Sequence, residues 1–236
     1  MQKEKYSTTP CYGYVPRIKY EFKDAELFGS EMWKYQILNK VKFWYGTPKP
    51  GNDNLKSKKI ILGIQCVYMD SISGNKKTTE QHCGDLSKED IEIKELELKE
   101  GDFFTNIFID FDCAITHIKL KTKDNNVIEV GEEKEENKKI VVINTEKNIQ
   151  MIQTFFGYYD TYGLRALGFK YISRKNFLLI NLMGVFRLRH IFNTNEKERE
   201  KWKNPDNLKK LNYKMLTVVK VCLLPDKTFF NVIQYC

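Results

Sequence analysis

The chain has 236 residues, 42% of them hydrophobic, and a formal net charge of +8, so it can bury one sizeable core with extensions or form two small domains. No apolar run follows its charged start, Met1–Lys5, and its longest apolar run, residues 177–186, is about half of what a membrane-spanning helix needs. Six cysteines without a CxxC motif do not form the pattern of a disulfide-rich secreted fold, so we expect a soluble, cytoplasmic protein with reduced thiols.

Residues 1–26 contain two prolines and lack sustained periodicity, so we expect an extended N-terminal arm. After the arm, β-forming residues and alternating apolar and polar side chains predict strands joined by polar loops. The predicted strands cover residues 37–45, 61–68, 106–112, 115–123, 140–143, 148–156 and 164–171. Polar loops are expected at residues 46–54 and 132–139.

One hairpin pattern occurs three times along these strands. It begins at Ile61, Ile115 and Leu164, and these positions are 54 and 49 residues apart. Each copy has spaced apolar residues and is followed by a polar turn, at residues 73–75, 124–126 and 173–175. Three copies at near-constant spacing predict an all-β domain with pseudo-threefold symmetry. The residues that we expect to face its core are Ile64, Ile118 and Leu167.

At these residues the chain resembles the jacalin-type lectin family. Residues 101–131, which begin Gly-Asp-Phe-Phe-Thr-Asn-Ile, resemble the family's middle repeat, and residues 155–171, which begin Phe-Phe-Gly, resemble its last. The resemblance covers residues 27–176 and implies a β-prism of three four-stranded Greek-key sheets. The alternative is an unrelated all-β sandwich whose periodicity arises by chance.

Residues 177–236 lie outside the family's domain and form a predicted C-terminal extension. Residues 177–180 are either a last prism strand or the start of this extension. Glu196–Lys203 is a charged helical run, followed by Asn204 and Pro205 as an N-cap and a first helical residue. Residues 216–224 and 228–235 flank a Pro-Asp-Lys turn and predict a β-hairpin.

The net charge is unevenly distributed along the chain. Residues 1–60 have 12 basic and 6 acidic side chains, residues 61–150 have 12 and 19, and residues 151–236 have 15 and 6. Two interpretations remain open: the basic ends are solvated surface, or they dock on an acidic partner.

The family resemblance implies a sugar site formed by an N-terminal glycine-rich segment and a last-repeat loop that reads G-x-x-x-D. In this chain the loop aligns with residues 161–165, where Thr161 replaces the glycine and Arg165 replaces the aspartate. Arginine only donates hydrogen bonds, so it cannot accept those of sugar hydroxyls. A loop shifted by one residue would partly restore the site. Its candidate carbohydrate-binding residues are Gly157, Tyr158, Tyr159, Asp160 and Tyr162. The glycine pair is also missing, and residues 28–31, which contain Gly29, are the nearest candidate.

We identify no catalytic residue, metal site or cofactor site. His82 and Cys83 are adjacent, so a strand would direct them to opposite faces. His117 lies on the lysine-bearing face of its strand and is expected to be exposed, and His190 lies in a basic turn that faces solvent or an acidic partner. The pair Asp110 and Asp112 has no histidine or cysteine at metal-ligand spacing.

Together these patterns predict a non-catalytic interaction module, a structural subunit of a larger intracellular assembly that its extensions anchor. An acidic surface such as a microtubule, in the cytoskeleton or a cilium, is the kind of partner that suits basic ends. The alternative is a carbohydrate-binding lectin that uses the last-repeat loop. No recognition motif supports nucleic acid.

Overall fold

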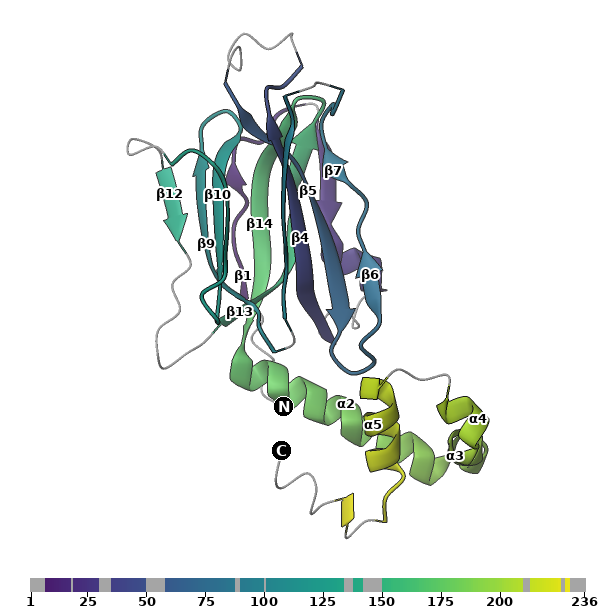
Figure 1. Cartoon of the computed structure of the whole chain (residues 1–236). Helices are drawn as coiled ribbons and strands as arrows, with labels where there is room; N and C mark the ends of the chain where they lie inside the picture. The colour runs from purple at the N-terminus through teal and green to yellow at the C-terminus, as the bar shows by residue number, and fades with distance from the viewer. Residues whose placement is uncertain are drawn as a thin grey trace. The chain divides into compact units, whose positions relative to one another are not determined.

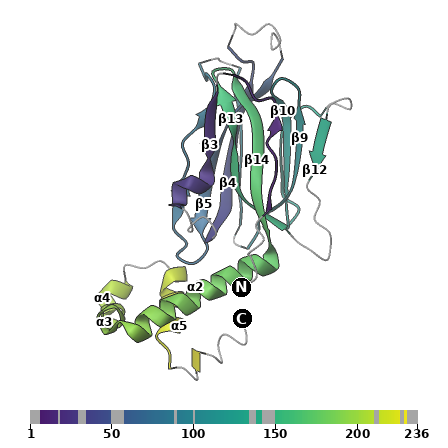
Figure 2. The ribbon, with the colours of Figure 1, turned by 180° about the vertical axis from the view of Figure 1, so that it is seen from behind.

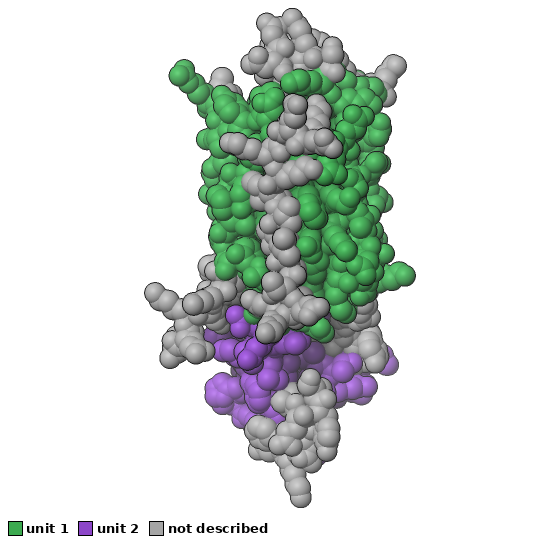
Figure 3. Space-filling view, turned by 90° about the vertical axis from the view of Figure 1, so that its left-hand side faces the viewer, with its two compact units in different colours: residues 1–69, 76–174 green, residues 70–75, 175–236 purple. Residues whose placement is uncertain are grey.

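The structure is a computed structural model whose described residues fall into two compact units, one of residues 1–69 and 76–174 and one of residues 70–75 and 175–236 (Figure 3). The described residues are 7–17, 19–29, 35–49, 58–87, 90–99, 101–133, 138–141, 150–209, 213–225 and 228–229. The first unit holds three antiparallel sheets, which Figures 1 and 2 show side by side.

The first sheet combines the last predicted hairpin with the N-terminal segment. Its order is β1-β14-β13-β3, and β2 also pairs with β14. The bounds are β1 Ser7–Thr8, β2 Tyr12–Gly13, β3 Tyr20–Lys23, β13 Gln150–Asp160 and β14 Gly163–Ser173. A short 3-10 helix, η1 (Asp24–Phe28), follows β3. The residues predicted as a separate arm therefore contribute strands to the sheet, because an otherwise open sheet edge offers backbone groups that an extended segment can bond.

The second sheet contains the middle repeat, in the order β11-β10-β9-β12. The bounds are β9 Phe104–Phe111, β10 Ile115–Thr122, β11 Val127–Gly131 and β12 Lys138–Val141. The turn between β10 and β11 lies where the sequence predicts it, and Asn125 has a φ of +65° there. Asparagine adopts this left-handed conformation more readily than most residues.

The third sheet contains the first repeat, in the order β6-β5-β4-β8, with β7 also paired to β5. The bounds are β4 Gln36–Gly46, β5 Ile60–Asp70, β6 Lys76–Thr78, β7 His82–Cys83 and β8 Glu92–Glu97. Parts of two predicted polar loops, residues 50–54 and 134–137, lie outside the described residues, whereas residues 138–139 belong to β12.

One hydrophobic core lies between the three sheets. Ile64, Ile118 and Leu167 are each fully buried in it, on strands β5, β10 and β14. The predicted three-sheet β-prism is therefore confirmed, and the first and third sheets each have one short strand more than the four predicted. Cys66, which is 1% exposed, packs in the same core, where burial raises the pKa of its thiol well above the usual value.

The second unit is helical where it is described. Its helices are α2 Arg174–Thr194, α3 Glu196–Lys203, α4 Pro205–Leu208 and α5 Tyr213–Cys222. The predicted charged helix is confirmed as α3, and the Asn204 side chain caps α4 by accepting the N–H of Asp206 at 2.9 Å. Within the described residues, no helix is long and apolar enough to cross a membrane.

The predicted turn at residues 173–175 is wrong, because Ser173 ends β14 and Arg174 begins α2. Residues 177–180 lie within α2, which agrees with the alternative that they start the extension. The β-hairpin predicted in the extension is wrong. Residues 216–222, predicted as a hairpin strand, lie in α5, and Thr228–Phe229 are helical too, while residues 230–235 lie outside the described chain. Valines favour a strand locally, but packing on the neighbouring helix overrides this preference, because Val219 and Cys222, three residues apart, both pack on Phe192.

Arg189 ties α2 to the end of α5. Its guanidinium donates hydrogen bonds to the carbonyls of Cys222 (2.9 Å) and Leu224 (2.7 Å) and lies 4.0 Å from the centre of the Phe229 ring. The residues around it, predicted as a basic turn, are helical, and His190 is exposed on α2.

Candidate carbohydrate loop

The loop that the family uses for sugar is a tight connection between β13 and β14. Asp160, the last residue of β13, pairs with Gly163, the first of β14. One oxygen of Asp160, Oδ1, accepts the N–H groups of Tyr162 at 2.9 Å and of Gly163 at 3.2 Å. This is the turn-closing bond that aspartate side chains make to their own backbone, so the carboxylate holds the loop in shape.

The other oxygen of Asp160 is taken by Arg165. The Nε of Arg165 donates to Asp160 Oδ2 at 2.7 Å, and its Nη1 donates to the carbonyl of Cys113 at 2.8 Å. The Arg165 side chain is 3% exposed and that of Asp160 is 10% exposed. Both carboxylate oxygens of the shifted candidate site are therefore occupied within the protein.

Two other segments lie against this loop. The N–H of Asp85 donates to the carbonyl of Thr161 at 3.0 Å, and a Cβ at Gly84 would lie only 2.6 Å from the nitrogen of Gly163. The backbone carbonyl of Arg165 accepts the N–H of Tyr14 at 3.1 Å. These backbone groups thus bond to the protein itself.

The N-terminal glycine that lies next to this site is Gly13, and the resemblance to the family did not single it out. It has a φ of +127°, and a Cβ there would lie 2.3 Å from the carbonyl oxygen of Arg165. Gly29, the predicted candidate, follows η1 and has open space around its Cα. The pairing of β2 with β14 brings Gly13 to the loop, and this long-range register has no signal in the local sequence.

The three candidate tyrosines have separate neighbours. The Tyr158 hydroxyl donates to Glu21 at 3.3 Å, and the Tyr158 ring lies under the ammonium of Lys19 at 4.4 Å. The ring of Tyr159 packs beside that of Tyr20, at 5.2 Å between centres. Tyr162 packs against the cluster of Trp44, Ile60, Leu62 and Ala114. The tyrosines therefore do not converge on one sugar-sized platform.

Gly157 has a packing role. It pairs with Leu167, and a Cβ at this position would lie 2.2 Å from the carbonyl oxygen of Ala166 and 3.0 Å from the Phe22 ring. A side chain would therefore separate β13 from β14, and this close approach explains the glycine.

Comparison with known families decides what this fold is. The sequence profile described as "Jacalin-like lectin domain" matches residues 53–170, half of the chain. The chain belongs to the jacalin-like lectin domain family. None of the curated protein sequences matches it.

Solved structures show the same fold. Malaysian banana lectin is 15% identical and has a TM-score of 0.51, and the similarity covers 72% of this chain and all of that one. Artocarpin in complex with Me-α-mannose is 14% identical and has a TM-score of 0.50, and the similarity covers 72% of this chain and 99% of that one. At these identities the similarity supports the β-prism fold of the jacalin-like domain and no residue-level role.

His82 of the jacalin-like domain belongs to a largely buried polar network. Its Nε2 lies 3.0 Å from Asp24 Oδ1, and the hydroxyl of Tyr68 donates to Asp24 Oδ2. The Tyr68 hydroxyl in turn accepts the N–H of Phe155 at 3.2 Å. Burial raises the pKa of Tyr68 well above its usual value. These bonds join η1, β5, β7 and β13, and Cys83 has no part in them.

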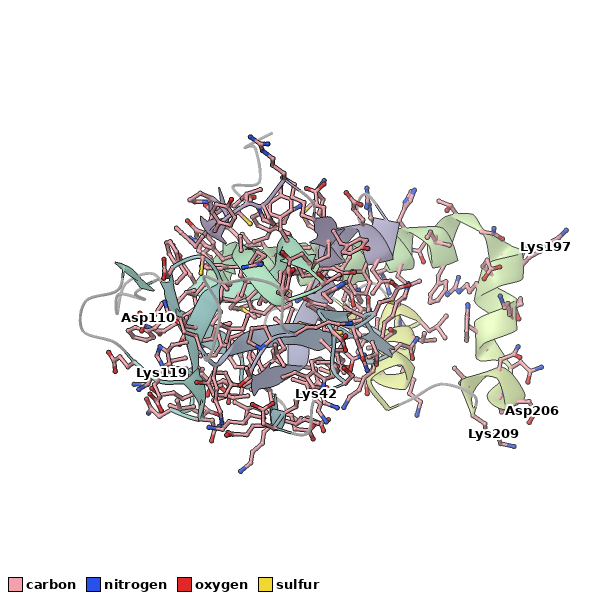
Figure 4. All side chains as sticks on the ribbon, turned by 90° about the horizontal axis from the view of Figure 1, so that it is seen from above. Lys42, Asp110, Lys119, Lys197, Asp206 and Lys209 are labelled. Atoms are coloured by element: carbon pink, nitrogen blue, oxygen red, sulfur yellow. The ribbon has the colours of Figure 1, made fainter. Side chains whose placement is uncertain are left out.

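The expectation that His117 is exposed is wrong, since its side chain is 2% exposed. Its Nδ1 lies 3.1 Å from Asp110 Oδ2 and its Nε2 lies 3.0 Å from Glu129 Oε1, while the ammonium of Lys119 lies 2.9 Å from Glu129 Oε2. A buried imidazole is tolerated when polar partners replace water. The partners of His117 come from the neighbouring strands β9 and β11, so only the strand register reveals them. Figure 4 marks Asp110 and Lys119.

Asp110 and Asp112, considered together in the sequence, have different partners. Asp110 is buried beside His117, whereas Asp112 is exposed and pairs with Lys58 at 3.4 Å. Among the described residues, no group of three or more histidine, cysteine or acidic side chains has the arrangement of a metal site.

Proposed function

We propose that this chain is a non-catalytic jacalin-like module that serves as a structural subunit of a larger intracellular assembly, and that its last-repeat loop does not bind monosaccharides. The observation that carries the proposal is the buried ion pair between Arg165 and Asp160. The carboxylate that would accept sugar hydroxyls already binds a guanidinium and two backbone N–H groups.

The energies favour the internal bonds over a sugar. Breaking one side of a buried ion pair costs about 3–5 kcal/mol, because a charge is left without a partner in a poorly solvated place. A hydrogen bond from a sugar hydroxyl to a carboxylate contributes a net of about 1.5–3 kcal/mol. One such bond to Asp160 would therefore not offset the loss of its ion pair with Arg165.

The second unit supports the assembly role. The family match ends at residue 170, whereas the chain continues into helices with their own apolar cluster of Phe192, Val219 and Cys222. Helices α2 to α5 are not needed to complete any strand of the prism. We infer that they anchor the module on an acidic protein surface, for which a microtubule in the cytoskeleton or a cilium is one candidate.

Two measurements test this proposal. On a glycan array the full-length protein should show no binding at ordinary lectin affinities. In a native density gradient of its own cells, the protein should sediment far ahead of a 28.0 kDa monomer. Sub-millimolar sugar binding that is lost in Tyr158→Ala or Tyr162→Ala would support the lectin alternative, and sedimentation as a free monomer would contradict the assembly role.

A further inference from the structure

The middle sheet contains a histidine whose two ring nitrogens both face acidic side chains. The Nδ1 of His117 lies 3.1 Å from Asp110 Oδ2, and its Nε2 lies 3.0 Å from Glu129 Oε1. Asp110 belongs to β9 and Glu129 to β11, and β10 pairs with both of these strands. The imidazole therefore connects three neighbouring strands through its side-chain contacts.

Two of these three side chains are almost completely buried. The side chain of His117 is 2% exposed and that of Asp110 is 1% exposed, whereas that of Glu129 is 38% exposed. A buried carboxylate is stable only when hydrogen-bond donors or an opposite charge replace the water that it loses. The protonation of the imidazole therefore decides how well the buried Asp110 is accommodated.

Two carboxylates ask more of the ring than its neutral form supplies. A neutral imidazole has one N–H group and one acceptor nitrogen, whereas the imidazolium ion has two N–H groups. In the neutral form, one ring nitrogen of His117 would direct a lone pair at a carboxylate oxygen. In the imidazolium form both nitrogens are donors, and the positive charge offsets that of Asp110. The geometry therefore fits the ring with two protons.

Other charged groups face this cluster from three strands. On β10, the ammonium of Lys119 lies 2.9 Å from Glu129 Oε2, and Lys94 of β8 donates to the backbone carbonyl of Glu129 at 3.1 Å. On β12, Lys139 pairs with Asp110 in the strand register. Hydrogen bonds from Lys119 and from the imidazole hold the pKa of Glu129 below its usual value, although burial opposes them. Glu129 therefore stays ionised at neutral pH and remains an acceptor for the ring.

We propose that Asp110, His117 and Glu129 form a proton-dependent clasp that ties β9 and β11 to β10. The clasp is closed when both ring nitrogens carry a proton. A proton that the folded chain binds more tightly than the unfolded chain stabilises the fold. This contribution is complete below the ordinary histidine pKa of about 6.5 and is lost as the pH rises above it. The clasp therefore loosens the middle sheet towards alkaline pH.

Hydrogen exchange of the full chain at about pH 6 and about pH 8 tests the clasp within the range in which histidine side chains titrate. Protection factors correct the exchange rates for the intrinsic effect of pH on amides. The amides of β9, β10 and β11 should lose about tenfold in protection between the two conditions, because the release of one proton changes an opening equilibrium by up to about tenfold per pH unit. Equal protection at both pH values overturns the proposal.

Asp110→Asn is the decisive variant, because an amide has no charge to offset and can donate to a neutral ring nitrogen. Protection of the three strands should then change less than about twofold between the two pH values. Asp112→Asn is the matched control at an exposed carboxylate just after β9, and it should keep the tenfold change. The proposal fails if Asp110→Asn keeps the pH dependence or if Asp112→Asn removes it.

Two further measurements keep the proposal testable if Asp110→Asn does not fold. His117→Gln removes the titratable ring, so its protection should be lower at about pH 6 and should lose the pH dependence. Nitrogen-15 NMR of the histidine rings in the unmodified full chain shows which ring nitrogens carry protons. Both nitrogens of His117 should carry one at about pH 6. A neutral ring at that pH, or a pH dependence that survives His117→Gln, overturns the proposal.

Discussion

Arg165 stands where the family has an aspartate, so a hydrogen-bond donor replaces a hydrogen-bond acceptor. In the structure, the Arg165 guanidinium donates to the carboxylate of Asp160. The guanidinium joins Asp160 to the carbonyl of Cys113, so it connects the loop of the first sheet to the connection between β9 and β10. The family's sugar loop has thus become an internal structural link. At the scale of single residues, the positions that would bind a ligand instead stabilise the fold.

We expect Arg165→Ala to lower the free energy of unfolding by about 3–5 kcal/mol, because Asp160 would remain buried without its ionic partner. Urea unfolding followed by fluorescence measures this change. Lys121→Ala, which removes an exposed cation from β10, should change stability by less than about 0.5 kcal/mol. A loss no greater for Arg165→Ala than for Lys121→Ala would contradict the structural role.

Asp102 is a second residue whose carboxylate organises a turn. It accepts the N–H of Phe103 at 2.9 Å, the N–H of Asp124 at 3.1 Å and the side-chain amide of Asn126 at 3.0 Å. Burial raises the pKa of this carboxyl, but the hydrogen bonds outweigh that effect and hold the pKa below its usual value. The predicted Asp-Asn-Asn turn is thus fixed by a residue more than 20 positions before it.

This depressed pKa predicts a pH dependence. A carboxyl group with a lower pKa in the folded state stabilises the fold above the ordinary aspartate pKa of about 3.9, and this contribution is lost as the pH falls through the folded value. Asp102→Asn should therefore lower stability at pH 7 and flatten its decrease in acid, as measured by urea unfolding from neutral pH to pH 2–3. Asp112→Asn, at an exposed carboxylate, should keep the steep dependence.

At the scale of elements, α5 shows how packing decides between helix and strand. Its valines predict a strand, but three-residue spacing of Val219 and Cys222 fits the surface of α2. Arg189 then bonds the carbonyl of Cys222, which the end of the helix leaves without an intrahelical donor, and the carbonyl of Leu224 just beyond the helix.

Arg189→Met should loosen α5 while the sheets keep their stability. The two carbonyls would lose a buried charged donor, which costs about 1–3 kcal/mol. Hydrogen exchange of the amides in Tyr213–Cys222 should become faster, with no change in β10. Arg187→Met removes the same charge from an exposed position of the same helix, and faster exchange in that variant as well would show that charge alone is responsible.

At the scale of the whole molecule, the described strands of the prism pair with one another and not with the helical unit. The last strand, β14, ends at Ser173, and its pairing with β13 begins at that residue, opposite Gln150. A chain that stops after Lys175 therefore keeps every described strand of the three sheets.

We expect this truncated chain to fold with the β-rich circular dichroism of the prism but to be lost from the native assembly. Attachment of the full chain should weaken with salt, because the screening length falls from about 10 Å at 0.1 M to about 3 Å at 1 M. Density gradients of cells that express each form measure both effects. Equal incorporation of the two forms would identify the prism itself as the docking surface.

The sequence by itself determined an all-β domain with pseudo-threefold symmetry, since alternation and a repeat of about 50 residues are properties of local segments, and its resemblance to the jacalin-type lectins implied the three-sheet prism. It also showed that Arg165 replaces the family's aspartate, and that Glu196–Lys203 is a helix with an asparagine cap after it. These features depend on residues close together in the chain. Local chemistry is therefore sufficient to predict them.

Only the tertiary structure decided the rest. His117 is buried because β9 and β11 bring Asp110 and Glu129 to its two nitrogens. Asp160 is occupied because Arg165 is itself fixed by the carbonyl of Cys113, 52 residues away. Residues 216–222 are helical because α2 offers a surface at helical spacing. Each outcome depends on partners that strand register and packing supply from distant segments, and local sequence does not encode those partners.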